Sequence, residues 1–176
     1  MDLKKLEVLL RAADNGYVDL CFFPLIRGGP FEYIDLVDDP MMVVLYPGHP
    51  LAKKRAIALE DLKDEPLLLA TNPRGLDYDV AKVLSEASFT PRIEATSNLD
   101  HIIFSMVQHH LGISIEAALM LTDKENAAVL RPFDPPQSRR LVMAARSFRT
   151  LSPAANQFVN HTKAALRKME PDRILF

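Results

Sequence analysis

The stretch that decides the fold is YPGHPLA, residues 46–52, followed closely by IALEDL, residues 57–62. An apolar run ends at Tyr46, and the two prolines and the glycine after it supply the chemistry of a sharp turn. His49 can hydrogen-bond across that turn, and we interpret it as a structural turn residue and not as a ligand-binding or catalytic group. The stretch therefore marks the exit from a strand.

Upstream of this turn, the spacing of apolar residues predicts one helix and three strands. The helix covers residues 3–13, and short apolar runs at 18–23, 34–37 and 41–46 are typical of strands. Residues 38–40, with the sequence DDP, are turn-like. We therefore expect a turn between the second and third of these strands.

Downstream of the turn, short apolar runs alternate with helical patterns. The expected strands lie at 67–70, 92–96, 112–115, 129–130 and 141–145, and the expected helices at 76–87, 99–107 and 153–166. The last helix has a clear start, with Ser152 as the N-cap and Pro153 at the first helical position. This alternation predicts a mostly parallel sheet covered by helices, and such sheets bind ligands at the carboxyl ends of their strands.

The composition limits the class of protein. With 176 residues, of which 48% are hydrophobic and 25% charged, the chain can bury a core without disulfides. Its net charge of −2 argues against strong nucleic-acid binding by this chain alone. The single cysteine, Cys21, lies in an apolar run and is expected to be a buried thiol. Neither a secretory signal nor a membrane span is recognisable, so we expect a cytoplasmic protein.

Three further patterns join the opening stretch in a fixed order. They are GYVDL at residues 16–20, the approach to a strand at 107–115, and LSPAA leading into a helix at 151–158. Together with YPGHPLA, IALEDL and the EPL of residues 65–67, they resemble the effector-binding domain of LysR-type transcriptional regulators. The resemblance covers most of the chain, and the order and spacing of the motifs make it more specific than any one of them.

The resemblance implies an α/β, two-lobed fold of the periplasmic-binding-protein-like type II class, with two crossover strands. Lobe I would be discontinuous, formed by residues 1–63 and 138–176, and lobe II would be formed by residues 64–137. The effector would bind in the cleft between the lobes. In that family such domains pair side by side as antiparallel homodimers, and DNA is bound by a separate domain that this sequence does not contain.

The sequence also departs from the family pattern. The usual first strand, first helix and second strand are missing, so lobe I is expected to be truncated at its N-terminus. A fragment, a truncated reading frame and a gap covered by a partner chain remain open as explanations. His110 stands where the family usually has glycine, and Glu116 stands where a proline is common.

One group of candidate ligand-binding residues follows the strand at 67–70. Thr71, Asn72 and Arg74 combine short polar side chains with a guanidinium close to a helix start, where free backbone N–H groups can hold a carboxylate or another anion. The alternative is a helix cap with a solvated arginine. The functional interpretation predicts an anionic group on the effector.

A second group follows the strand at 92–96. Thr96, Ser97 and Asn98 precede a helix in the same way, and the alternative for them is an N-cap. Pro24, at the end of an expected parallel strand, would shape the wall of the cleft. Ser114 is a small polar residue within a buried strand and completes the candidate ligand-binding set.

We therefore predict a small-molecule effector-sensing and dimerisation domain of a LysR-type bacterial regulator, not an enzyme, without a cofactor. A solute-binding protein of the same fold is one alternative, which the missing secretory signal disfavours. A cleft enzyme such as a dehydratase is another, but neither Thr71 nor Ser97 has an adjacent histidine to activate it. The histidines at 101, 109 and 110 lack a metal-ligand spacing, so no metal site is expected.

Overall fold

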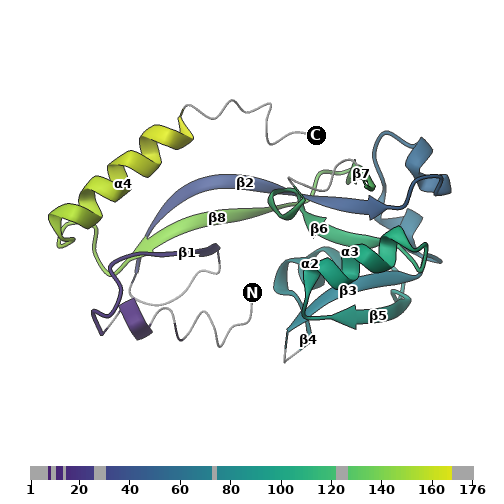
Figure 1. Cartoon of the computed structure of the whole chain (residues 1–176), viewed down its shortest axis with the longest axis horizontal. Coiled ribbons are helices and arrows are strands. Elements are labelled where there is room, and N and C mark those ends of the chain that lie inside the picture. The colour runs from purple at the N-terminus through teal and green to yellow at the C-terminus, as the bar shows by residue number, and fades with distance from the viewer. Residues whose placement is uncertain are drawn as a thin grey trace. The chain divides into compact units, whose positions relative to one another are not determined.

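The chain passes between two compact units in the long strands β2 (Glu32–Leu45) and β8 (Ser138–Ala145) (Figure 1). The computed structural model describes residues 8, 11–13, 15–25, 31–72, 75–121 and 127–167. Unit 1 comprises Leu3–Asp39 and Arg139–Arg173, and unit 2 comprises Pro40–Ser138. This division assigns residues 40–63 to unit 2, because Ile57 and Leu62 lie in the core of that unit. The lobe boundaries expected from the sequence stay a prediction.

Unit 2 holds two groups of strands. Its elements are β6 (Ser114–Ala117), β7 (Val129–Pro132), β3 (Leu67–Asn72), β4 (Gly75–Leu76) and β5 (Ile93–Ser97). Strand β2 pairs antiparallel with both β6 and β7. In the second group, β3 pairs antiparallel with β4 and parallel with β5. The parallel pair brings the carboxyl ends of two strands to one edge.

In unit 1, strand β1 (Cys21–Pro24) pairs antiparallel with β8. The expectation of a mostly parallel sheet is wrong for the described residues, where β1–β8, β2–β6, β2–β7 and β3–β4 are all antiparallel. For the pairs that involve β2 or β8, the reason lies in the crossovers. Strand β2 runs from unit 1 into unit 2, where it pairs antiparallel with β6 and β7. Strand β8 runs from unit 2 into unit 1, where it pairs antiparallel with β1.

Helices cover both faces of β3. They are α2 (Tyr78–Ser85) and α3 (Asp100–Gln108), and the chain also forms α4 (Pro153–Leu166) and the 3-10 turns η1 (Pro50–Lys53), η2 (Leu59–Leu62) and η3 (Ala118–Met120). α2 packs on the face of β3 that carries Leu67 and Leu69, and α3 packs on the face that carries Leu68. The predicted start of α4 is confirmed, because Ser152 Oγ accepts a hydrogen bond from the N–H of Ala155 at 3.2 Å.

The alternation of side chains along β2 divides the interior of unit 2 into two cores. Met41, Val43 and Leu45 enter the core beneath α2, whereas Met42 and Val44 enter the core beneath α3. Unit 1 has a smaller core, formed by Ala13, Cys21, Phe23, Val142 and Ala144. Cys21 is buried there, as predicted from its apolar surroundings, and burial raises the pKa of its thiol.

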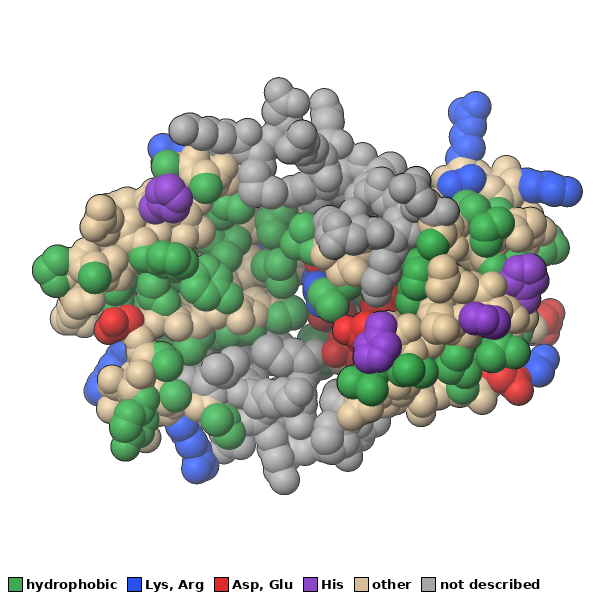
Figure 2. All heavy atoms as spheres, viewed as in Figure 1, with side chains coloured by type: hydrophobic (Ala, Val, Ile, Leu, Met, Phe, Trp, Pro, Cys, Tyr) green, Lys and Arg blue, Asp and Glu red, His purple; other side chains and the backbone are tan. Residues whose placement is uncertain are grey.

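Several large apolar side chains remain exposed, and Figure 2 shows hydrophobic side chains at the surface over both units. In α3 the helical spacing of the apolar residues predicts that Leu99 and Ile102 lie on the inner face, together with Ile103, Met106 and Val107. The side chains of Leu99 and Ile102 are nevertheless 49% and 41% exposed. The buried stripe of α3 is formed by Ile103 and Val107 instead. None of the helices in the described part of the chain combines the length and the apolar character needed to cross a membrane.

Strand β2 is a single strand of 14 residues. The sequence predicted two strands with a turn at residues 38–40, and that prediction is wrong. Pro40 lies within the strand even though it has no N–H to donate, and the neighbouring Met41 donates its N–H to the carbonyl oxygen of Gln137 at 2.8 Å. The chain therefore continues in an extended form through a sequence that is typical of turns.

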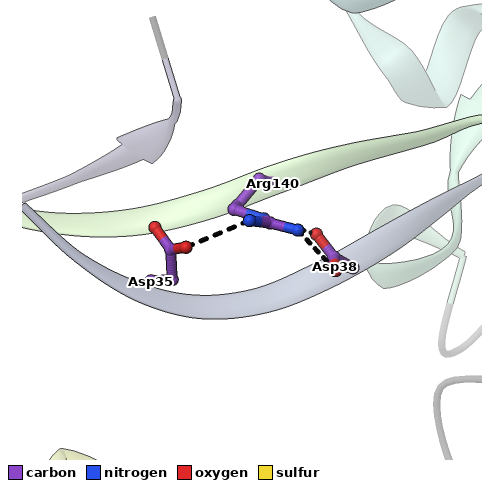
Figure 3. Close-up of polar contacts among 3 residues, drawn as sticks. All are labelled: Asp35, Asp38 and Arg140. Carbon is purple, nitrogen blue, oxygen red and sulfur yellow. Dashed lines mark hydrogen bonds and ion pairs between the residues drawn. The ribbon is translucent and has the colours of Figure 1, made fainter. Parts of the chain in front are cut away.

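The two aspartates of this segment are held by arginines from β8. Asp39 is fully buried, and Arg139 Nε donates to its Oδ2 at 2.8 Å. On the exposed side, Arg140 donates to Asp38 at 2.8 and 3.0 Å and to Asp35 at 3.1 Å (Figure 3). The hydrogen bond and the charge of Asp38, together with the charge of Asp35, raise the pKa of Arg140. These ion pairs explain why acidic residues occur within a strand.

Candidate functional site

The candidate site begins at the edge where β3 and β5 end. The parallel register aligns Leu69 with Thr96 and Ala70 with Ser97, so Thr71 and Ser97 come to the same edge of the sheet. Both side chains are half-buried, whereas Thr96 is exposed. The sequence predicted two separate polar groups, each after a strand, and the register makes the two strand ends neighbours.

Ser97 has a local hydrogen bond. Its Oγ accepts from the N–H of Leu99 at 3.1 Å, immediately before α3 begins at Asp100. The N-cap of α3 is Leu99, and no side chain caps the helix there, so the bond of Ser97 closes a local turn and is not the N-cap that was its alternative. The hydroxyl proton remains available to a second acceptor. The neighbouring Asn98 is exposed.

The segment after β3 differs from the expected loop. Thr71 pairs with Leu76 in a short antiparallel ladder, and α2 begins only at Tyr78. The cap of that helix is Asp77, whose Oδ1 accepts from the N–H of Asp79 at 3.1 Å. A helix cap formed by Thr71, Asn72 or Arg74, which was the alternative to ligand binding, is therefore wrong, since the helix starts later than expected. Arg74 and the side chain of Asn72 lie outside the described residues.

Pro24 belongs to unit 1. It ends β1, as predicted, but its strand pairs antiparallel with β8, with Pro24 opposite Leu141, and not parallel as expected. Its side chain is half-buried, and the preceding Phe23 lies in the core of unit 1.

Ser114 lines a small pocket within unit 2, beneath α3. Its side chain is 1% exposed and lies on β6, opposite Val44 of β2. The residues around the pocket come from β2, α3, β6 and η3, and they are Val44, Asp100, Ile103, Phe104, Ser114, Glu116, Met120 and Leu121. The free space is that of about one water molecule.

The sequence did not single out Asp100 or Glu116 as ligand-binding residues. Both line the same pocket as Ser114, from the first turn of α3 and from β6. In the sequence, Glu116 stands out only because a proline is common at its position in the family that the chain resembles. That departure was a usable signal, because an acidic side chain on a buried strand has to reach some polar environment.

His49 acts as a structural group in the turn after β2. Its Nδ1 accepts from the N–H of Leu51 at 3.2 Å, and its Nε2 lies 3.3 Å from Glu65 Oε2. Since Nδ1 accepts, the neutral ring carries its proton on Nε2 and donates to Glu65. Tyr46 packs edge-on against His49 and stacks on His110 with ring centroids 4.2 Å apart. The structural interpretation of His49 is supported by these contacts.

His110 takes the backbone conformation of the glycine that it replaces. Its φ of +62° lies in the left-handed region that favours glycine, at the end of α3. Within the described ranges, no group of three or more histidine, cysteine or acidic side chains is placed to hold a metal ion.

Curated relatives of the chain are transcriptional regulators. The HTH-type transcriptional regulator YwbI of Bacillus subtilis (strain 168) is 30% identical over 138 residues, which cover 77% of this chain and 46% of that protein. The RuBisCO operon transcriptional regulator of Allochromatium vinosum is 26% identical over 166 residues, which cover 90% of this chain and 54% of that protein. The chain spans about half the length of the curated relatives it matches.

Solved structures of the same fold include the CcmR regulatory domain of Synechocystis PCC6803 in complex with 2-PG, with a TM-score of 0.79 at 20% identity. That match covers 93% of this chain and 80% of the other. The effector binding domain of QuiR in complex with shikimate gives a TM-score of 0.75 at 22% identity and covers 92% of this chain and 78% of the other. The predicted type II periplasmic-binding-protein-like fold is thereby confirmed.

A family model, described as LysR substrate binding domain, matches residues 2–167. This match covers nearly all of the sequence and agrees with the resemblance carried by its motifs. The chain belongs to the LysR substrate binding domain family.

Proposed function

We propose that this chain is the effector-sensing and dimerisation domain of a cytoplasmic LysR-type transcriptional regulator that binds DNA through another domain. The observation that carries the proposal is the parallel register of β3 and β5, which brings Thr71 and Ser97 together where the two strands end. Ligands of parallel α/β sheets bind at that end of the strands. Family membership and the regulators among its relatives support the same function.

The effector in this proposal is a small metabolite with an anionic group. Hydroxyl groups of Thr71, Thr96 and Ser97 would donate to it, and Asn72, Arg74 and Asn98 would extend the polar side of the site. Pro24 and Ser114 would complete the ligand-binding set. The proposed lobes are lobe I, residues 1–63 and 138–176, and lobe II, residues 64–137. In this function the protein binds its effector and catalyses no reaction.

A metabolite screen followed by one substitution tests this site. We expect at least one member of a panel of small carboxylates and phosphorylated acids to raise the melting temperature of the full chain, because a ligand that binds only the folded state stabilises it. Thr71→Val removes the hydroxyl while keeping the shape of the side chain. It is expected to weaken that ligand about 10-fold, the value of one hydrogen bond to a charged group.

The matched control is Thr150→Val. Thr150 lies in unit 1, where its Oγ1 donates to the carbonyl oxygen of Ser147 at 3.3 Å. The Thr150→Val variant should bind the same ligand with the affinity of the unaltered chain. Equal binding by Thr71→Val and Thr150→Val would place the effector elsewhere. A folded chain that no member of the panel stabilises would count against effector sensing itself.

We also expect a homodimer. Membership of the LysR substrate binding domain family supports this expectation, and the exposed apolar side chains of Leu99, Ile102 and Leu111 on unit 2 would be available for such a contact. Light scattering coupled to gel filtration should give about twice the chain mass of 19.8 kDa. A chain mass that stays at the monomer value over the whole concentration series would contradict the dimerisation part of the proposal.

A further inference from the structure

The pocket beneath α3 contains a buried hydroxyl group that has no partner. Ser114 is 1% exposed, and its Oγ forms no hydrogen bond within the described parts of the chain. Ser114 is also one of the residues that line the pocket. Buried polar groups are normally hydrogen-bonded, so an unpartnered hydroxyl beside an open space indicates that something else binds there.

The lining of the pocket determines which chemical group fits. Asp100 and Glu116 add carboxylates to the Ser114 hydroxyl, and the remaining lining residues are apolar. Among the described residues that line the pocket, none carries a positive charge. Glu116 takes part in another contact as well, so Ser114 and Asp100 carry the argument. The pocket therefore offers hydrogen-bond acceptors and negative charge to its occupant.

A primary ammonium group matches this environment in three ways. It carries three N–H donors, which the hydroxyl and carboxylate oxygens can accept. Its positive charge is attracted to Asp100 in a partly buried place, where attraction is stronger than in water. Its size is close to that of a water molecule, which is about the space that the pocket provides. An anion would be repelled by the carboxylates, and a neutral hydroxyl could donate only one hydrogen bond and would lack the positive charge.

We propose that this pocket binds the primary ammonium group of a small amine, with Ser114 Oγ and the Asp100 carboxylate as its acceptors. The apolar side chains Ile103, Phe104 and Met120 would contact the carbon atom attached to the nitrogen. The site lies within unit 2 and shares Ser114, but neither Thr71 nor Ser97, with the effector site proposed above.

Methylammonium chloride is the probe that tests the proposal. With the full chain, thermal shift and titration followed by NMR chemical shifts should show saturable binding of methylammonium in the millimolar range, as expected for a ligand of so few atoms. Sodium chloride at the same ionic strength should not reproduce it. Tetramethylammonium, which has the charge but no N–H donor, and methanol, which has a hydroxyl but no charge, should both bind at least 10-fold more weakly.

Two substitutions assign the binding to this pocket. Asp100→Asn keeps the shape of a half-buried side chain in the first turn of α3 and should weaken methylammonium at least 10-fold. Ser114→Ala should weaken it several-fold. The matched control is Glu94→Gln, which removes an exposed carboxylate on β5 outside the pocket and should leave the affinity unchanged. If Ser114→Ala does not fold, as judged by circular dichroism, Asp100→Asn carries the test.

Three results would overturn the proposal. They are a methylammonium response no larger than that of sodium chloride, an affinity that Asp100→Asn leaves unchanged, and methanol binding as tightly as methylammonium. The last result would assign the pocket to a water molecule or a hydroxyl group.

Discussion

Replacing Arg139 with methionine is expected to lower the free energy of unfolding by about 3 kcal/mol, the cost of breaking a buried ion pair by removing one partner. Asp39 is fully buried, and Arg139 Nε donates to it at 2.8 Å across β2 and β8. The variant removes the guanidinium and leaves the carboxylate buried. We expect a loss at the low end of the range known for such substitutions, because Asp39 has further contacts that remain in the variant. Urea unfolding followed by circular dichroism measures the loss.

The next residue in the chain provides the control. Arg140 is 46% exposed, and solvent screens its pairs with Asp35 and Asp38. Arg140→Met should therefore cost far less than Arg139→Met, although the pKa of Arg140 is raised by Asp38 and Asp35. The double variant Asp39→Leu with Arg139→Met should recover most of the lost stability, since no charge stays buried. Equal losses for the two arginine variants would refute this account.

The second large effect is expected for Gly112→Ala, with a loss of about 3 kcal/mol from overpacking. A Cβ atom at this position would lie 2.3 Å from the carbonyl oxygen of Pro66 and 3.0 Å from Leu68 Cγ. The backbone cannot move aside easily. Ile113 donates its N–H to that same Pro66 oxygen at 3.0 Å, and Leu68 donates to the Ile113 carbonyl at 2.8 Å. Thermal and urea unfolding should both show the loss.

Gly48→Ala separates steric contact from backbone conformation. Gly48 has a φ of +92°, but nothing lies within 4 Å of a Cβ built on it. Its replacement should cost only the conformational penalty of the left-handed region, about 1 kcal/mol. If Gly112→Ala were no more destabilising than Gly48→Ala, the contact with Pro66 would not be the constraint we describe.

Local signals predicted local structure well. Ser152 and Pro153 specify the start of α4, and the apolar surroundings of Cys21 placed it in a core, because both depend on neighbours in the sequence. The turn predicted at residues 38–40 was wrong for the opposite reason, because the structure of this segment depends on residues far away in the sequence. Acidic residues and a proline are typical of turns, and the arginines that keep them in a strand follow about a hundred positions later. A pattern in one segment cannot show its distant partner.

The candidate site could likewise be predicted from the sequence only where it depends on neighbouring residues. Polar residues were expected after each of the strands that end near Thr71 and Ser97, but the sequence did not show that these strands are neighbours, which depends on the register that aligns Ala70 with Ser97. Asp100 was not expected beside Ser114, because that meeting depends on which stripe of α3 faces the sheet. In so short a helix the apolar residues allow more than one stripe, and Ile102 was assigned to the inner face although it is exposed.

The acidic and proline residues inside β2 also have a consequence before the protein has folded. Residues 41–45, MMVVL, are wholly buried in the folded chain, but in a nascent or refolding chain they form an uncharged run of the kind that joins intermolecular sheets. Asp38, Asp39 and Pro40 act as gatekeepers directly in front of that run. Arg139 is synthesised 100 residues after Asp39. During synthesis the charges of Asp38 and Asp39 therefore act against aggregation, and they form their ion pairs only after β8 has been synthesised.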